Sequence, residues 1–367
     1  RAVTVPPLPP LLVRGRIDRL RERLATLPVD ALLVHRLVDV RWLTGFAGSA
    51  GLVLVTADDA ALVTDPRYGD RATVELAAAG AEVTVEVGGP GARERYLRER
   101  LAGRRLGVDA SAVTWAQARE LVDGTAVAVE PLDPLVPTLR EVKDDAEVAR
   151  IAACAAVADE ALASVRPILA DEPTEAEVAR LLDRTMEDLG ADGPGYGTIV
   201  ASGPNAALPH AAPGDRRIAP GDTVIIDVGA EVDGYRSDMT RSFVIGEPDL
   251  DQERWLDVVH DAQTVAIDHV RPGSTGREVH EAAAAVLAGH DLRDAFVHGV
   301  GHGVGLVIHE TPFLAESDEP LRPGQVVTVE PGVYLPGRGG VRWEDLLVVT
   351  DDGAHVLTAA PKDPIVR

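Results

Sequence analysis

The sequence predicts an α/β domain over residues 1–140 followed by an α+β domain over residues 141–367. Before residue 140, short apolar strands alternate with amphipathic helical patterns, which is typical of an α/β domain. After residue 141, long helical patterns and antiparallel hairpins come in blocks, which is typical of an α+β domain. The 367 residues allow two domains of ordinary size, and a hydrophobic content of 46% allows each a buried core.

The N-terminal domain begins with a proline-rich lead-in and a helix over residues 14–27. An apolar run predicts a buried strand at 30–35, and a turn-rich hairpin follows it, with short strands at 51–56 and 60–64 about the turn at 57–59. Further strands are expected at 82–87 and 106–109, and further helices at 68–79, 92–102 and 115–122. The segment GFAGSAG at 45–51 leads into a strand and lacks the G-x-G-x-x-G order, which favours a turn over a phosphate site. With His35 as its one histidine, this domain is expected to carry no catalytic chemistry.

The C-terminal domain is expected to hold four helices and two hairpins. Capping-box patterns at Thr174 and Thr275 each open a helix, and an acidic cap at Asp144 opens another. The helices are expected at 144–169, 174–189, 250–270 and 275–288, and the hairpin strands at 223–228, 235–243, 326–334 and 341–350. Asp233-Gly234 predicts the first hairpin turn and GRGG at 337–340 the second. Because each hairpin carries two acids, the pair hints at an internal duplication.

Composition excludes several classes of partner. With 36 basic against 59 acidic residues the formal net charge is −23, which argues against nucleic acids and anionic membranes. No apolar run approaches the roughly 18 residues of a membrane span, so a soluble protein is expected. Arginine and prolines interrupt the start of the chain where a secretory signal needs an apolar core, which favours a cytoplasmic location. The single cysteine, Cys154, excludes an internal disulfide and is expected in the core.

Four acids on the predicted hairpins point to a metal site. Asp227 and Asp238 face each other on the first hairpin, and Glu330 and Glu344 stand on the second. A buried carboxylate without a partner costs several kcal/mol, so acids that converge in an apolar hairpin need positive charge nearby. A metal ion is the natural source of that charge.

Histidines are concentrated in the segment VHGVGHGVGLVIHE. His298, His302 and His309 are interleaved there with glycines, which exclude the helix that a zinc-protease His-Glu motif requires and favour a tight loop. His210 lies in a proline- and glycine-rich loop of the kind that lines clefts. Four further histidines of the second domain fall in helical stretches without matching motifs and are interpreted as structural or exposed: His260, His269, His280 and His290.

The acids and one histidine together resemble a known signature. Asp227 in IIDVGA, Asp238 in YRSDMTRSF, His302 in HGVGHGVG, Glu330 in TVEPGVY and Glu344 in VRWED resemble the five ligands of the pita-bread metallopeptidases. That family includes Xaa-Pro aminopeptidases, prolidases, methionine aminopeptidases and the metal-free creatinase. The motif SGPNAALPH is similar to its substrate loop, and RWLTGFAGSAGLVLVT resembles the N-terminal domain of the creatinase and prolidase branch.

The resemblance implies two divalent ions. Asp238 and Glu344 would bridge them, Asp227 would bind one ion and His302 the other, and Glu330 would complete the site and shuttle a proton. Oxygen ligands with one imidazole favour Mn or Fe and are also compatible with Co or Zn. A thiolate zinc site is impossible with one cysteine.

The resemblance also implies groups that meet the substrate. His309 would donate to the scissile carbonyl or its oxyanion, His298 would contact the residue after the scissile bond, and His210 would help close the cleft. A purely structural role for His210 is the alternative. Arg342, two residues before Glu344 in a strand, would pair with the carboxylates or meet a substrate C-terminus.

The expected function is a dinuclear metal-dependent exopeptidase that cleaves the N-terminal Xaa-Pro bond of small peptides with proline in second position, an Xaa-Pro aminopeptidase. The alternative is an Xaa-Pro dipeptidase, or prolidase. A noncatalytic scaffold and a creatinase-like amidinohydrolase are further alternatives, although neither needs all five ligands. The branch also implies a homodimer.

Overall fold

The computed structural model describes residues 5–125, 127–315 and 317–367, which divide into two compact units. One unit is Pro9–Arg140. The other unit is Glu141–Arg367, and the described residues 5–8 belong to it as well. The first is an α/β unit and the second is a mixed α+β unit, as the sequence predicts.

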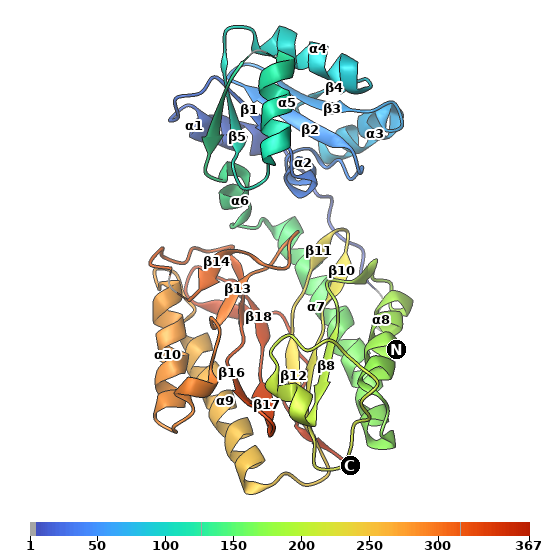
Figure 1. The fold of residues 1–367 in the computed structure, drawn as a ribbon, viewed down its shortest axis with the longest axis vertical. Helices are drawn as coiled ribbons and strands as arrows, with labels where there is room; N and C mark the ends of the chain where they lie inside the picture. The colour runs from blue at the N-terminus through green and yellow to red at the C-terminus, as the bar shows by residue number, and fades with distance from the viewer. Residues whose placement is uncertain (1–4, 126, 316) are drawn as a thin grey trace. The chain divides into compact units, whose positions relative to one another are not determined.

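The Pro9–Arg140 unit is built on one six-stranded sheet with the strand order β4-β3-β2-β1-β5-β6 (Figure 1). Its strands are β1 Ala31–Val34, β2 Gly51–Thr56, β3 Ala60–Thr64, β4 Thr84–Val87, β5 Arg105–Asp109 and β6 Ala128–Leu132. Its helices are α1 Arg16–Leu24, α2 Leu37–Thr44, α3 Gly69–Ala79, α4 Pro90–Leu101, α5 Trp115–Thr125 and α6 Leu135–Arg140. β1 pairs antiparallel with β2 and parallel with β5, so the sheet is mixed.

Three elements of this unit were not predicted: α2, β6 and α6. Helix α2 stands in a stretch to which the sequence assigned no helix or strand, and no side chain caps its start. The expected hairpin of 51–56 and 60–64 is present as β2 and β3. Its buried Asp39 pairs with Arg140 at 2.5 Å, and the equally buried Arg140 ends α6. A contact between residues so far apart in the chain leaves no periodic signal in either segment, because tertiary packing overrides local propensity.

The Glu141–Arg367 unit places two pairs of helices on opposite sides of its strands (Figure 1). Helices α7 Asp145–Val165 and α8 Glu175–Asp188 lie on one side, and α9 Leu250–His269 and α10 Gly276–Ala288 on the other. The expected capping boxes at Thr174 and Thr275 are both formed, and Asp144 and Asp249 cap α7 and α9 in the same way. Trp255, Val259 and Leu287 of α9 and α10 pack in one apolar core with Trp343.

The strands of this unit form several small sheets, with the orders β20-β12-β9-β8, β14-β13-β15-β18-β19, β11-β10-β7 and β16-β17. The strands before α9 are β7 Gly193–Pro194, β8 Ile199–Ser202, β9 Thr223–Asp227, β10 Ala230–Val232, β11 Tyr235–Arg236 and β12 Thr240–Ile245. Those after α10 are β13 Gly301–Gly303, β14 Glu310–Leu314, β15 Val326–Val329, β16 Gly332–Leu335, β17 Gly339–Arg342, β18 Asp345–Val349, β19 Ala354–Val356 and β20 Ile365–Val366. Short 3₁₀ helices lie at Arg166–Asp171, Gly203–Ala207 and Arg293–Ala295.

Both predicted hairpins exist, but three of the four predicted strands are broken in two, namely 235–243, 326–334 and 341–350. The remaining one, 223–228, is present as β9, and after a break the short strand β10 follows it. In the first hairpin β9 pairs with β12, whereas the tip beyond the break, β10 with β11, belongs to another sheet. The second hairpin repeats this: β15 pairs with β18, and its tip pairs β16 with β17. The expected turn at Asp233 and Gly234 closes the first tip, with φ of 47° and 74°. The sequence prediction extended three of the strands through these breaks, because strand-forming residues lie on both sides of each break.

Gly229 shows why the first hairpin can bend at its break. A Cβ atom on Gly229 would lie 1.9 Å from the carbonyl oxygen of Ser237, so the two chains approach too closely for any side chain there. In the second hairpin, Pro331 follows Glu330 at the break and has no N–H with which to continue the ladder. The breaks therefore follow from the residues that occupy them.

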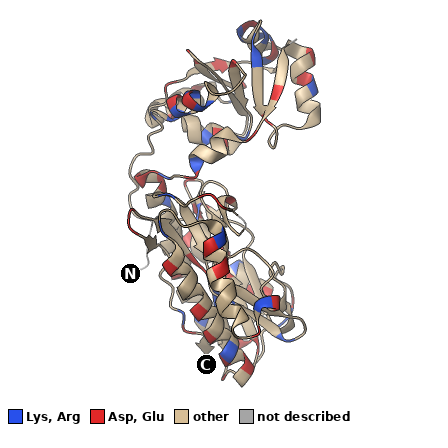
Figure 2. Cartoon of the chain, turned by 90° about the vertical axis from the view of Figure 1, so that its left-hand side faces the viewer, with Lys and Arg blue, Asp and Glu red and all other residues tan. Residues whose placement is uncertain are grey.

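Within the described ranges, we find no helix with both the length and the apolar character that a bilayer crossing requires. In the view of Figure 2 the Lys and Arg residues are scattered among Asp and Glu residues and form no continuous basic stripe.

We predict that Gly229→Ala destabilises the Glu141–Arg367 unit by about 2 to 3 kcal/mol, because the new methyl group forces the hairpin chains apart at the break. Urea unfolding of the variant measures the loss. Gly353→Ala is the matched control, because a Cβ atom there meets no atom within 4 Å, and it should change the unfolding free energy by less than about 0.5 kcal/mol. Equal stability of the two variants would contradict the close approach at the break.

Candidate functional site

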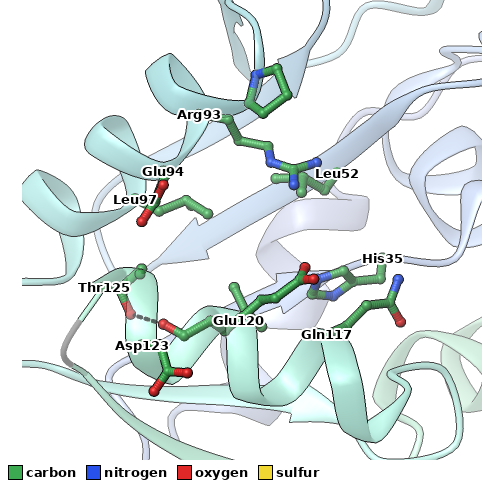
Figure 3. Close-up of a pocket in the computed structure, with 12 residues that line it drawn as sticks. His35, Leu52, Arg93, Glu94, Leu97, Gln117, Glu120, Asp123 and Thr125 are labelled. Carbon is green, nitrogen blue, oxygen red and sulfur yellow. Dashed lines mark hydrogen bonds between the residues drawn. The ribbon is translucent and has the colours of Figure 1, made fainter.

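Two of the cavities in the described part of the chain are lined by histidines together with charged side chains. One of about 460 Å³ lies in the Pro9–Arg140 unit between α4 and α5, with His35 and Leu52 on its floor (Figure 3). Its charged lining residues, Arg93, Glu94, Glu120 and Asp123, are all exposed, which is ordinary for the solvated faces of two helices. That cavity gives no reason to revise the expectation that this unit lacks catalytic chemistry.

The other cavity, of about 670 Å³, lies in the Glu141–Arg367 unit, and every site residue expected from the sequence lines it. The nine are Asp227, Asp238, His302, Glu330, Glu344, His298, His309, His210 and Arg342. Apolar side chains also line it, among them Ile199, Ile308 and Phe313. The structure thus brings together residues that span more than a hundred positions of the chain.

Each of the four acids stands at a break of a hairpin strand. Asp227 is the last residue of β9, and Asp238 lies between β11 and β12. Glu330 lies between β15 and β16, and Glu344 between β17 and β18. All but Glu330 are buried, and the Glu330 side chain is only 17% exposed. The breaks therefore release these residues from the sheet alternation and let both hairpins present two acids to one cavity.

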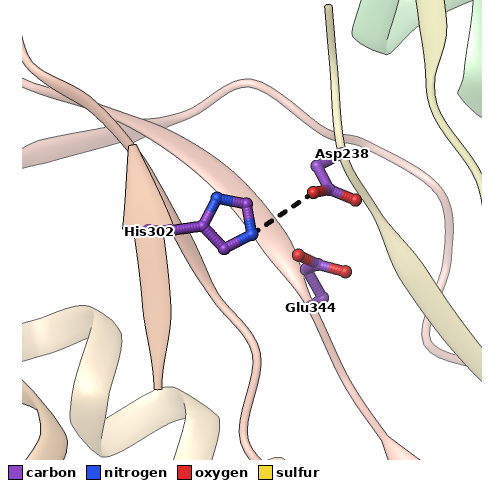
Figure 4. A group of neighbouring side chains, drawn as sticks. All are labelled: Asp238, His302 and Glu344. Atoms are coloured by element: carbon purple, nitrogen blue, oxygen red, sulfur yellow. Dashed lines mark ion pairs between the residues drawn. The ribbon is translucent and has the colours of Figure 1, made fainter. Parts of the chain in front are cut away.

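Asp238, His302 and Glu344 form a tight buried group (Figure 4). One potential ligand atom from each lies within 4.8 Å of the others. His302 Nε2 is 3.6 Å from Asp238 Oδ2 and 3.3 Å from Glu330 Oε1. His302 Nδ1 lies 3.1 Å from the carbonyl oxygen of Gly303, to which only a protonated Nδ1 can donate. Nε2 is therefore the nitrogen that faces the acids.

The sequence suggested a loop for all three histidines, but His302 lies on the short strand β13 between β14 and β15. Its glycine neighbours make this arrangement possible, because a Cβ atom on Gly301 would lie 2.0 Å from the carbonyl oxygen of Thr328. The expected loop follows at 304–309 and carries His309. The ring centres of His302 and His309 are 4.3 Å apart.

Arg342 is enclosed by partners from the protein itself. Its Nη2 donates to Asp227 Oδ2 at 2.6 Å, and its Nε donates to Thr240 Oγ1 at 2.9 Å. Its Nη1 donates to the hydroxyl of Tyr334 at 2.9 Å. Thr240 in turn donates to Glu344 Oε2 at 2.7 Å. The expected pairing of Arg342 with the carboxylates is therefore present, directly for Asp227 and through Thr240 for Glu344.

His298 is held in one tautomer. Its Nδ1 lies 2.8 Å from the carbonyl oxygen of Gly299, so Nδ1 carries the proton. Burial lowers the pKa of His298 and keeps the ring neutral, so Nε2 accepts the hydroxyl proton of Tyr334 at 2.9 Å. His210 and His309 differ from it, because both are exposed at the cavity.

Tyr196 is the site residue that sequence reasoning missed. Its hydroxyl bonds with Asp227 Oδ1 and lies 2.5 Å from Asp238 Oδ1, so it joins the two acids of the first hairpin. Tyr196 stands in the segment GPGYGTIV, where a lone aromatic residue among glycines was the one available signal. No spacing rule links such a tyrosine to acids about thirty and forty residues later.

Residues 149–351 match metallopeptidase family M24, and residues 16–142 match the creatinase/prolidase N-terminal domain. The chain belongs to metallopeptidase family M24. Its fold is a creatinase-type α/β domain followed by a pita-bread catalytic domain, and the protein is a metallopeptidase hydrolase, as the sequence predicts.

Three relatives of this M24 protein span its whole length. The Xaa-Pro dipeptidase of Pyrococcus horikoshii is 31% identical over 357 residues, which cover 96% of this chain and 99% of the relative. The solved structure of an Xaa-Pro dipeptidase from Bacillus anthracis has a TM-score of 0.91 at 32% identity and covers 97% of this chain and 100% of that one. The X-Pro aminopeptidase structure from Thermotoga maritima has a TM-score of 0.86 at 30% identity, covering 96% and 99%.

The electrostatics of the M24 site fit the divalent metals that the family implies. Burial, together with the charges of neighbouring acids, raises the pKa values of Asp238 and Glu344 well above their usual range. Burial acts to lower the pKa of His302, but the hydrogen bond and charge of Glu330 outweigh it and raise that pKa to about 9. Burial likewise acts to raise the pKa of Glu330, yet His302 holds it at about 2. Without a metal, Arg342 balances the charge of Asp227 and His302 balances that of Glu330, whereas Asp238 and Glu344 avoid charge by holding protons.

The residues present therefore match a cation site in chemistry as well as in position. Carboxylates whose pKa is raised by mutual repulsion gain most from a cation placed between them. The nitrogen of His302 that faces them is the one without a backbone partner, as in ligating histidines. This supports a divalent metal held by the Asp238, His302 and Glu344 group.

We predict that a metal-free preparation releases protons when it binds Mn²⁺ near pH 7. Asp238 and Glu344, with raised pKa values, and His302, with a pKa of about 9, hold protons that a metal must displace. Titration calorimetry in buffers of different ionisation enthalpy measures the release. Glu344→Gln should weaken binding at least about tenfold, whereas Asp318→Asn at an exposed ion pair should not change it. Buffer-independent heats would contradict the protonation scheme.

Proposed function

We propose that this M24 metallopeptidase is an Xaa-Pro dipeptidase that uses two divalent ions. The sequence favoured an Xaa-Pro aminopeptidase and kept the dipeptidase as its alternative. The names of the Pyrococcus horikoshii relative and the Bacillus anthracis structure support that alternative better. The observation on which the proposal chiefly depends is the convergence of four acids and one imidazole in a single cavity lined with apolar side chains.

The five proposed ligands are Asp227, Asp238, His302, Glu330 and Glu344. Their donors are oxygens with one nitrogen, a set that suits manganese among the divalent ions that the sequence suggested. When bound, such ions polarise a carbonyl and lower the pKa of a water molecule. Arg342 and Tyr196 act on the protein side by fixing the orientation of the Asp227 carboxylate, one oxygen each.

The remaining polar groups are assigned to proton transfer and substrate contact. We assign proton transfer to Glu330, whose carboxylate is ionised and is the most exposed of the four acids. It would carry a proton to the leaving nitrogen of proline. His309 faces the cavity and is exposed there, but partial burial of its ring still lowers the pKa of the imidazole. The ring is therefore neutral and can donate one hydrogen bond to the developing oxyanion. His298, locked by Gly299 and Tyr334, forms a fixed wall against which the residue after the scissile bond lies.

For Arg342 and His210 we choose among the roles that the sequence left open. The guanidinium of Arg342 donates to Asp227, Thr240, Tyr334 and the Pro209 carbonyl, so we propose that it orients the metal ligands and does not bind a substrate carboxylate. His210, exposed on the rim, is then the group that meets the far end of a bound dipeptide and helps close the cleft.

Selectivity for proline has a physical basis in this cavity. An Xaa-Pro bond has no N–H, so peptidases that bind the amide hydrogen handle it poorly, whereas a polarised carbonyl does not require that hydrogen. The apolar side chains of Ile199, Ile308 and Phe313 offer a surface for the pyrrolidine ring. The Xaa-Pro aminopeptidase remains the second candidate, because the Thermotoga maritima structure shares the whole fold. The homodimer that the resemblance implies stays a prediction.

We predict that metal-stripped protein reloaded with Mn²⁺ hydrolyses an Xaa-Pro dipeptide faster than the matching Xaa-Pro-Yaa tripeptide, and that it leaves Xaa-Ala untouched. Release of the N-terminal residue, followed by chromatography, measures all three. His309→Ala should lower kcat about 100-fold with a smaller effect on KM, because the hydrogen bond that it removes forms in the transition state.

Each other outcome points elsewhere. Faster turnover of the tripeptide would establish the aminopeptidase in place of the dipeptidase. Absence of hydrolysis for both proline peptides, with metal bound, would reject a proline peptidase and favour another reaction on this scaffold.

A further inference from the structure

The two lysines of this chain, Lys143 and Lys362, stand among 34 arginines (36 basic residues less two lysines). Lys143 is almost fully enclosed, with 1% of its side chain exposed. Its Nζ lies 2.7 Å from Glu310 Oε1, and the Glu310 side chain is 9% exposed. A buried ion pair thus joins the first residues of the Glu141–Arg367 unit to a segment 167 positions later.

Glu310 lies beside the site, at the end of the loop that carries His309. It directly follows His309 and begins strand β14, where it pairs with Gly303 of β13. Residues 304–309 form the loop between these two strands, so Glu310 closes the loop at its far end. The position of Glu310 therefore limits where the imidazole of His309 can lie.

Lys143 is itself fixed from several directions. Its backbone N–H donates to the carbonyl of Gly324 at 2.8 Å, and its neighbour Val142 forms a bridge with Gln325, just before β15. Its ammonium also donates to the carbonyl of Glu141 at 3.2 Å. Lys143 is thus attached to the same sheet that carries His302. These backbone contacts fix the position from which its ammonium group reaches Glu310.

The loop packs directly on the ion pair. A Cβ atom on Gly305 would lie 2.4 Å from Glu310 Oε1 and 3.1 Å from Lys143 Cε. The start of the 304–309 loop therefore lies over the ion pair, and the end of the loop is bonded to it through Glu310. This close packing also leaves little room for the wider guanidinium of arginine, which explains a lysine at this position.

We propose that the Lys143–Glu310 pair positions His309 for the reaction, acting through the 304–309 loop and touching no substrate. The role rests on the proposed function, in which His309 contacts the substrate carbonyl. Removal of either partner leaves a buried charge unpaired, which is strongly unfavourable and would move the loop. Removal of both charges with apolar residues avoids that penalty and isolates the positioning effect.

The test compares Lys143→Met/Glu310→Met with wild type, each with and without His309→Ala, on manganese-loaded enzyme and an Xaa-Pro dipeptide. We expect kcat to fall about 100-fold in the double variant, with KM and bound metal little changed, because a displaced catalytic group slows the chemical step. In the His309→Ala background the same two substitutions should lower kcat by less than about threefold. Arg277→Gln, which breaks the exposed pair with Asp318, is the control and should leave kcat unchanged.

The positioning role would be overturned if the two substitutions lowered kcat by the same factor with and without His309. An unchanged kcat in the folded double variant would overturn it too. Lys143→Arg offers a further check, because it keeps the charge but not the fit, and its kcat should fall as well.

A second measurement is independent of activity. Amide hydrogen exchange of residues 304–310 should be about tenfold faster in Lys143→Met/Glu310→Met than in wild type, and unchanged in Arg277→Gln. If wild type cleaves no proline peptide, the proposed function fails, and the exchange rates alone decide whether the pair fixes the loop. Unaltered exchange in the double variant would overturn the inference.

Discussion

The constraint on which the rest of this structure depends is the mutual repulsion of four carboxylates in one enclosed cavity. Burial and neighbouring charges raise the pKa values of Asp238 and Glu344 well above their usual range, while His302 and Glu330 stabilise each other's charged forms. A protein keeps such an arrangement at a cost in stability, which a bound cation offsets. The surrounding hydrogen bonds from Arg342, directly and through Thr240, then serve to hold acids that would otherwise separate.

The fold meets this constraint with two hairpins that break where the acids stand. An unbroken strand would point alternate side chains to opposite faces, so the interruptions let each hairpin direct two acids to one place. The two halves are alike: α7 and α8 flank the hairpin of β9 and β12, and α9 and α10 flank that of β15 and β18 (Figure 1). An internal duplication, suggested by the sequence, is in keeping with this likeness and stays a prediction.

Much of the fold could be predicted, and the nine residues expected in the site line one cavity, because the signals used were local. Capping boxes at Thr174 and Thr275 and the turn at Asp233 depend on a few adjacent residues, and the acids were found through motifs of similar length. The features that the sequence did not predict have no such local signal. Helix α2, the role of Tyr196 and the Lys143–Glu310 pair depend on contacts between distant segments, which neither periodicity nor composition records.

The most direct test of the central claim, that these residues form a two-ion site, is anomalous diffraction from crystals of the manganese-loaded protein. We expect two manganese peaks roughly 3.5 to 4 Å apart in the cavity, with ligand atoms from Asp227, Asp238, His302, Glu330 and Glu344. A single peak would contradict the two-ion site. Peaks elsewhere, with the five side chains arranged as they are without metal, would contradict the assignment of the site itself.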